Sequence, residues 1–131
     1  MNAQMTRPGH VIRLHFVIAA VVIVQNATTV RADEVSDGQS AFAACSACHS
    51  IDGSEGLGPH LNGLIGRKAG SVAGFNYSPA MKRANIVWDA QSLDKFLADP
   101  QQGVPGNRMP FSGLSDAAKR TDIAVYLGTL K

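Results

Sequence analysis

The pattern of apolar and polar residues predicts three main helices. The clearest covers residues 90–98, where apolar positions recur at helical spacing and form one stripe. The members of this stripe, at positions i, i+3 and i+4, are Leu93, Phe96 and Leu97. A second helix is expected at residues 116–129, and a shorter one at residues 37–45 with Phe42 on its apolar face. No segment alternates between apolar and polar residues as a half-buried strand would, so the pattern favours an all-α fold.

Residues suited to helix ends stand at the boundaries of these stretches. A short polar side chain at a helix start accepts hydrogen bonds from free N–H groups of the first turn. The expected N-caps are Ser36 or Asp37, Asp89 and Ser115. Ser78 followed by Pro79 predicts one further, short helix, since proline fits the first helical position. Asp99 and Pro100 are expected to end the 90–98 helix.

Residues 51–74 carry glycines in place of a periodic apolar pattern. Such spacing predicts loops. A mature chain of about a hundred residues has a thin core of its own, and a buried cofactor would supply missing apolar interior. We therefore expect helices joined by long loops that wrap closely around a bound group.

The first 32 residues resemble a secretory signal and are not expected to be part of a folded domain. Basic residues precede an apolar run at residues 14–24, and Val30-Arg31-Ala32 places small residues on both sides of a cleavage position. We expect cleavage after Ala32, export to the periplasm, and a mature domain at residues 33–131. The alternative is an uncleaved membrane anchor. Eleven residues span only about 16 Å as a helix, against roughly 30 Å of bilayer core.

Cleavage would reverse the sign of the charge. The whole chain carries 12 basic and 10 acidic residues, a net charge of +2. Three of the arginines, Arg7, Arg13 and Arg31, would leave with the signal, so nine basic residues would face 10 acidic ones. A mature domain near −1 has no basic surface of the kind that binds nucleic acid.

The most specific chemistry lies at Cys45-Ser46-Ala47-Cys48-His49. Cys-x-x-Cys-His is the attachment pattern of a c-type haem. Two thiols can add to the two haem vinyl groups, and the following histidine can offer an imidazole nitrogen to the iron. The other interpretations of Cys-x-x-Cys are a redox disulfide and half of a zinc site. Neither fits well, because the chain has no other cysteine and no thioredoxin-like βαβ pattern.

Further residues suit a haem site. A ligating histidine needs a hydrogen bond from its other ring nitrogen, and a rigid loop such as Gly58-Pro59 can present a carbonyl for it. A second axial ligand would come from one of two methionines or a spare histidine. These candidates are Met81, Met109 and His60. Met109 stands between two prolines in a loop, whereas His60 is typical of a surface loop.

These motifs together resemble class I cytochrome c, of the cytochrome c2 and c550 types and the mitochondrial-type branch. The similarity runs from Gly38 to the C-terminus. Its matching stretches are Cys45 to His49, Gly58 to Leu61, Gly63, Gly66 to Lys68, Gly74 to Ser78, Trp88, Pro105 to Met109, Phe111, and Tyr126 with Leu127. The resemblance implies the class I cytochrome c fold, with three main helices, a short helix and long loops around one haem.

The resemblance also implies a role for each site residue. Cys45 and Cys48 would carry the thioethers, and His49 and Met109 would be the iron ligands. Pro59 would supply the carbonyl for His49. The residues that would hydrogen-bond or neutralise the haem propionates are Arg67, Tyr77 and Trp88, although Trp88 also suits plain core packing.

Three residues depart from the family pattern. Phe96 stands where a tyrosine often bonds the methionine sulfur, Asn107 replaces a usual threonine, and Met81 replaces a usual asparagine. The ring of lysines seen in many family members is thin in this chain. Its remaining cations are Lys68, Lys82 and Arg108.

The function implied is a soluble, monomeric electron carrier and not an enzyme. Its partners would be an oxidase, a reductase or a periplasmic dehydrogenase, met in brief docking encounters. Two alternatives stay open. One is a haem enzyme or gas sensor with an open distal site, which the missing tyrosine at Phe96 would suit. The other is an electron-transfer subunit of a larger dehydrogenase.

Overall fold

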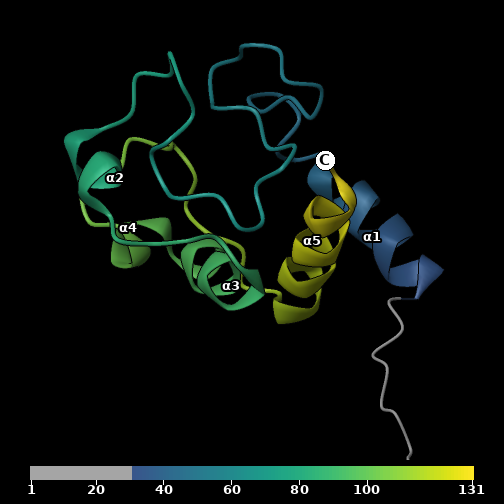
Figure 1. Cartoon of the computed structure of the whole chain (residues 1–131). Coiled ribbons are helices and arrows are strands. Elements are labelled where there is room, and N and C mark those ends of the chain that lie inside the picture. Colours follow the sequence, from purple (N-terminus) through teal and green to yellow (C-terminus); the bar gives the residue numbers. More distant parts are fainter. Residues whose placement is uncertain (1–30) are drawn as a thin grey trace, which may run out of the picture.

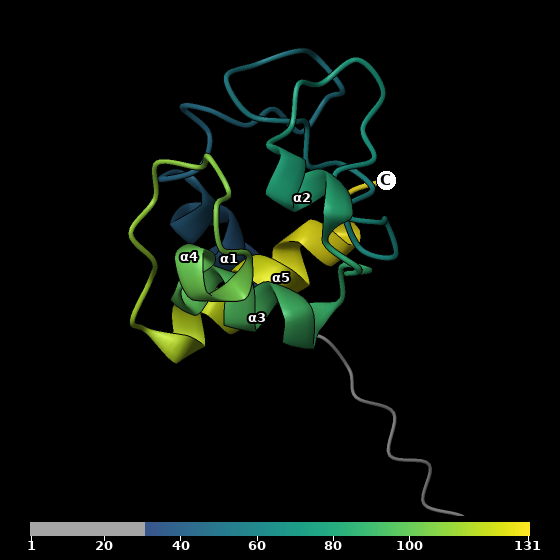
Figure 2. The same cartoon turned by 90° about the vertical axis from the view of Figure 1, so that its left-hand side faces the viewer.

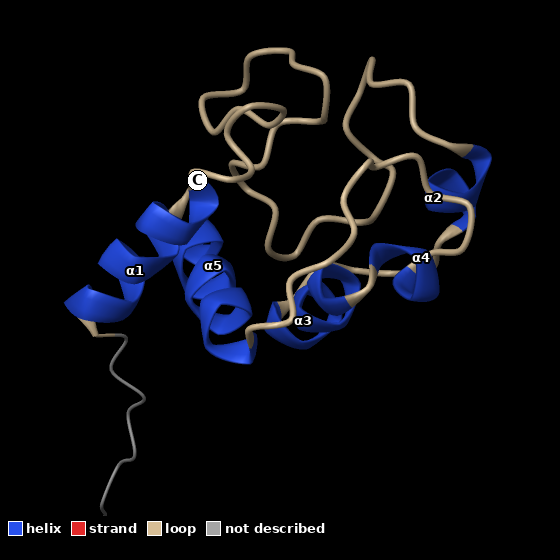
Figure 3. Cartoon of the chain, turned by 180° about the vertical axis from the view of Figure 1, so that it is seen from behind, coloured by secondary structure: helices blue, strands red, loops and turns tan. Residues whose placement is uncertain are grey.

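The computed structural model describes residues 31–131, and this part of the chain is helical with long loops (Figures 1 and 3). The helices are α1 (Ala32–Phe42), α2 (Pro79–Arg83), α3 (Ala90–Ala98), α4 (Pro100–Gly103) and α5 (Ala117–Thr129). Among the described residues there is no strand, only one isolated bridge between Lys68 and Val87. The all-α prediction is confirmed, with α1, α3 and α5 as the main helices.

The predicted signal lies outside the described residues, except for Arg31 and Ala32. From residue 31 onward, no helix combines the length and the apolar character needed to cross a bilayer.

The predicted start and end of the first helix were wrong. Helix α1 begins at Ala32, not at Asp37, because Asp33 and Glu34 suit the positive end of a helix dipole and extend it by a turn. The Glu34 carboxylate also accepts a hydrogen bond from the Arg31 backbone N–H at 3.3 Å. The helix ends at Phe42, not at Cys45, and tight turns continue from there.

Two other helix boundaries also differ from the prediction. Asp116, not Ser115, caps α5, since its carboxylate accepts from the N–H groups of Ala118 and Lys119. Pro100 does follow the end of α3, but it also starts α4, which the sequence pattern did not predict. Asp99 caps α4. The start of α2 at Pro79, the bounds of α3, and the caps Ser78 and Asp89 are as predicted.

Helices α1 and α5 cross closely, and they lie side by side in Figure 1. Gly38 makes this possible: a Cβ on that residue would lie 2.0 Å from the backbone oxygen of Asp122. The rings of Phe42 and Tyr126 pack 5.6 Å apart at the same crossing. The first and last helices of the described chain are therefore joined by direct packing.

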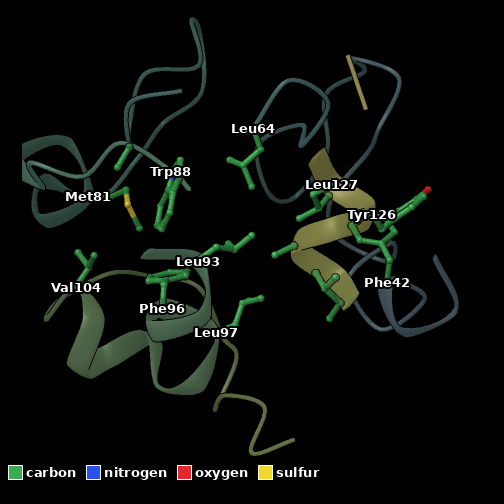
Figure 4. Packing of buried hydrophobic residues seen from close by; sticks show 13 residues of the cluster. Phe42, Leu64, Met81, Trp88, Leu93, Phe96, Leu97, Val104, Tyr126 and Leu127 are labelled. Carbon is green, nitrogen blue, oxygen red and sulfur yellow. The ribbon is translucent and has the colours of Figure 1, made fainter. Parts of the chain in front are cut away.

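The core extends from this crossing to α2 and α3 (Figure 4). At its far side Trp88 and Phe96 meet edge to face, with ring centroids 5.2 Å apart. Figure 2 shows the segment between α4 and α5 running along one side of the helices. Arg120 fixes the end of this segment by donating to the carbonyls of Leu114 and Ser115, and it pairs with Asp94 at 2.7 Å.

Candidate functional site

A cavity of about 720 Å³ lies between the helices and the long loops. All eight residues singled out in the sequence line it: Cys45, Cys48, His49, Pro59, Arg67, Tyr77, Trp88 and Met109. Much of the remaining wall is apolar, and Figure 4 shows Leu64, Leu93 and Leu127 around its open centre. The fold therefore brings together side chains that are up to 64 positions apart, from Cys45 to Met109, around one apolar space.

The Cys-x-x-Cys-His stretch forms compact turns directly after α1. Cys45 and Ser46 donate backbone N–H groups to the Phe42 carbonyl, at 2.8 and 3.1 Å. Cys48 and His49 donate to the Cys45 carbonyl, at 3.1 and 3.0 Å. Both cysteines are half-buried free thiols. Burial raises the pKa of the Cys45 thiol, and the neighbouring Cys48 raises it further, so Cys45 is a neutral thiol near pH 7.

His49 is oriented by the loop that follows it. Its ring Nδ1 lies 2.7 Å from the Pro59 carbonyl oxygen, so Nδ1–H donates and Nε2 keeps a lone pair for a metal. Gly58 lies against the ring, where a Cβ would sit 2.3 Å from Cε1. The Gly58 N–H donates to the Cys48 carbonyl at 2.8 Å, which closes this loop onto the cysteine turn.

Sequence reasoning found Pro59 but missed the role of Gly58. The glycine stood among many others in residues 51–74, and nothing local marked it as the one beside the histidine. Only the structure shows that Gly58 lies against the His49 ring, next to the conformationally fixed Pro59. Glycine is required here because no side chain fits between the loop and the imidazole.

Arg67 brings a positive charge to the cavity without a carboxylate to match it. Its guanidinium donates to the carbonyls of His60 and Asn62, at 2.7 and 3.1 Å. The one ion pair among residues 31–131 joins Arg120 to Asp94 instead. Burial lowers the pKa of Arg67, and Tyr77 partly opposes this; burial also raises the pKa of Tyr77. A guanidinium and a phenol at one wall suit an anionic group.

Trp88 is 7% exposed and packs on Phe96, as its core-packing interpretation requires. Its backbone also fixes Arg67. The Trp88 N–H donates to the Arg67 carbonyl at 2.9 Å, and the Gly66 N–H donates to the Trp88 carbonyl at 2.7 Å. These bonds hold Arg67 and Trp88 on adjacent parts of the wall.

Two methionines line the cavity, whereas His60 does not. His60 is half-buried, with its ring Nδ1 2.8 Å from Asn62 Oδ1. Met81 is 9% exposed on α2. Met109 is half-buried in the loop after α4, and its backbone N–H donates to Asn107 Oδ1 at 2.9 Å. The wall thus presents either methionine as a candidate second ligand.

These features fit a covalently held haem. The apolar wall matches a porphyrin, and the glycine beside His49 leaves room for a ligating ring. The adjacent reduced cysteines and the half-buried Arg67 match its vinyl and propionate groups.

The sequence model for cytochrome c matches residues 35–131. The chain belongs to the cytochrome c family. Its cofactor is accordingly one haem c, attached covalently at the Cys45–His49 motif, and members of this family are electron-transfer proteins and not enzymes.

Individual relatives extend the comparison. Cytochrome c2 iso-2 of Magnetospirillum fulvum is 44% identical over 96 residues, which cover 72% of this chain and 100% of the relative. The cytochrome c-type cyt cy of Rhodobacter capsulatus is also 44% identical, over 78% of this chain, but the match spans only 51% of that protein. The solved structure of cytochrome cH from Methylobacterium extorquens superposes with a TM-score of 0.70, at 44% identity and over 97% of its chain. The prediction of a class I cytochrome of the c2 type is confirmed.

Proposed function

We propose that this chain is an exported, soluble electron carrier of the periplasm, with His49 and Met109 as axial ligands of its haem iron. The observation that carries this proposal is that the cysteine–histidine turn and the proline-flanked Met109 line one cavity. The iron of haem c supplies a reversible one-electron couple when it is bound. A second ligand at Met109 would leave no open position for a substrate.

The chain's own residues would then set the environment of the haem. Cys45 and Cys48 would tether it, and the Pro59 carbonyl would hold the His49 ring in one tautomer. Arg67 and Tyr77, which share one wall and shift each other's pKa, would receive the propionates. Trp88 would border the same groups while packing on Phe96.

Docking would use the rim of the cavity. Leu57, 83% exposed, is an apolar contact at this rim, and Lys68 and Arg108 are exposed cations that also line the cavity. Small, partly apolar contacts suit brief encounters with an oxidase, a reductase or a periplasmic dehydrogenase. The names of the similar c2 cytochromes support such a carrier role. We propose a monomer, with export following cleavage after Ala32 and the mature domain at residues 33–131.

The ligand assignment is tested by two matched variants, Met109→Ala and Met81→Ala. Met109→Ala is expected to abolish the near-infrared sulfur-to-iron band of the ferric protein, lower the reduction potential and admit cyanide or carbon monoxide. Met81→Ala removes the other methionine that lines the cavity and should do none of these strongly. Loss of the band in Met81→Ala alone would reverse the assignment. A ferric wild type that lacks the band and binds cyanide readily would favour the enzyme or sensor alternative.

A further inference from the structure

We propose that Asn107 is a positioning residue, which holds Met109 at the cavity by tying the methionine loop to α4. The inference rests on the proposed ligation by Met109 and specifies how this chain keeps that ligand in place.

The side chain of Asn107 joins three backbone groups. Its Nδ2 donates to the carbonyl of Pro100 at 2.7 Å and to that of Val104 at 3.0 Å. Its Oδ1 accepts the N–H of Met109 at 2.9 Å. The residue is only 6% exposed, so water competes little for these bonds. One buried amide therefore links the first and last parts of the α4 turn to the backbone of the methionine itself.

A second amide braces the same turn from outside. Gln101 Nε2 donates to the Asn107 carbonyl at 3.1 Å, and Gln101 Oε1 accepts the Gly106 N–H at 3.3 Å. The Asn107 N–H also donates to the Val104 carbonyl at 3.0 Å. The loop from Val104 to Met109 is thus fixed at several backbone positions, although it contains no regular helix.

Only an amide supplies this combination of groups. A threonine hydroxyl, the usual family residue here, has one donor and cannot reach two carbonyls while accepting from Met109. An aspartate would keep the acceptor but lose both side-chain donations, so the carbonyls of Pro100 and Val104 would keep only their backbone donors. Losing the amide in Asn107→Ala removes the acceptor of the Met109 N–H and both side-chain donations to α4, so the loop should loosen. A looser loop offers the sulfur to the iron less often, so an external ligand competes more effectively.

The test uses the ferric holoprotein and imidazole as the competing ligand. Asn107→Ala is expected to weaken the sulfur-to-iron band and to tighten apparent imidazole binding about tenfold, the effect of roughly one buried hydrogen bond. Asn107→Thr restores one polar contact and should fall between wild type and Asn107→Ala. Gln101→Ala, which loses only the outer brace, should give a smaller change. Gln102→Ala is the matched control, since its exposed side chain makes no hydrogen bond in the described part of the chain.

Val35→Ala distinguishes a positioning role of Asn107 from a purely structural one, because it removes half-buried contacts in α1 away from the cavity. Denaturant midpoints are measured for all variants. If Asn107→Ala changes imidazole affinity no more than Val35→Ala does at a similar loss of stability, the positioning role is wrong. If Asn107→Ala does not fold, the same comparison with Asn107→Thr and Gln101→Ala decides. An unchanged band in Met109→Ala would instead overturn the ligation on which the inference rests.

Discussion

The two walls of the haem cavity are held in different ways. The His49 wall depends on contacts within a short stretch, residues 42–59, where backbone bonds and the Pro59 carbonyl fix the ring. The Met109 wall depends on hydrogen bonds made by side chains, most of them within residues 100–109. Arg108 donates to the carbonyl of Asn76, which is 32 positions away, and Asn107 reaches back to α4. The His49 wall is held mainly by backbone bonds and is covalently tethered to the cofactor, whereas the Met109 wall is held by side chains, one of which reaches a separate segment.

This difference indicates which wall opens first. Segments with few buried apolar contacts open at lower free energy than packed elements, and most residues of the loop at 105–110 are exposed. The proposed bond from the Met109 sulfur to the iron would also be single and reversible, whereas the cysteines bind the cofactor covalently. We therefore expect ligand exchange to occur at the Met109 wall while the His49 wall stays closed.

Removing the covalent tether should have the largest effect. In Cys45→Ala/Cys48→Ala the cavity of about 720 Å³ would lack its occupant, and the loops around it would have little to pack against. We expect a largely unfolded chain with weak helical circular dichroism. A cooperative, native-like thermal transition in this apo variant would contradict the expectation.

Gly58→Ala should disturb the His49 wall. The new methyl group would meet the His49 ring at van der Waals overlap, and the ring or the loop must move. Overpacking of this kind costs about 1–3 kcal/mol. We expect that loss in the free energy of unfolding, together with a changed haem absorption spectrum. Gly53→Ala is the control, since a Cβ there meets nothing within 4 Å, although its positive φ carries a cost of its own. If Gly58→Ala and Gly53→Ala changed the haem spectrum equally, His49 would tolerate the methyl group.

Arg108→Ala should loosen the Met109 wall only slightly. The hydrogen bond to the Asn76 carbonyl is lost, but Arg108 is exposed and water can replace the donor. We expect a stability loss below about 1 kcal/mol and a faster rate of imidazole entry. Lys82→Ala removes an exposed cation on α2 and should leave that rate unchanged. An equal acceleration in both variants would assign the effect to charge alone.

The smallest effect expected is that of salt on electron transfer. If the proposed mature domain is near neutral charge, its positive residues near the haem are those expected from the sequence, Lys68, Lys82 and Arg108. Screening at 0.15 M salt acts over about 8 Å, so a dense lysine ring would give a steep fall in rate. We expect a shallow slope for the second-order rate with the native oxidase or reductase. A steep decline would mean that these three residues form a stronger patch than their number suggests.

The sequence could predict what is local or carried by a strict motif. The stripe of α3, the Ser78-Pro79 start of α2 and the Cys45–His49 motif needed no information from elsewhere in the chain. The hydrogen bond between His49 and Pro59 could also be predicted, because a proline stands ten positions after the histidine and a ligating imidazole needs an acceptor.

The rest depends on contacts that no local pattern records. Gly38 and Gly58 look like their neighbours until another backbone or ring lies against them. Asn107 appeared only as a departure from a usual threonine, and its role depends on where the carbonyls of α4 point. The start of α1 was missed because two acidic residues at its first turn weigh more than the cap-like Ser36 and Asp37.

The crossing of α1 and α5 has a consequence for a chain that is cut. A protease could nick the exposed stretch at residues 52–57 without separating the pieces. The first fragment would keep α1 and the tethered haem, and the second would keep α5, the Pro59 carbonyl and Met109. Packing of Gly38 against Asp122 would hold the two fragments together. The two fragments should therefore stay together and keep the colour of the intact haem protein. Elution of the haem fragment alone after nicking would contradict this expectation.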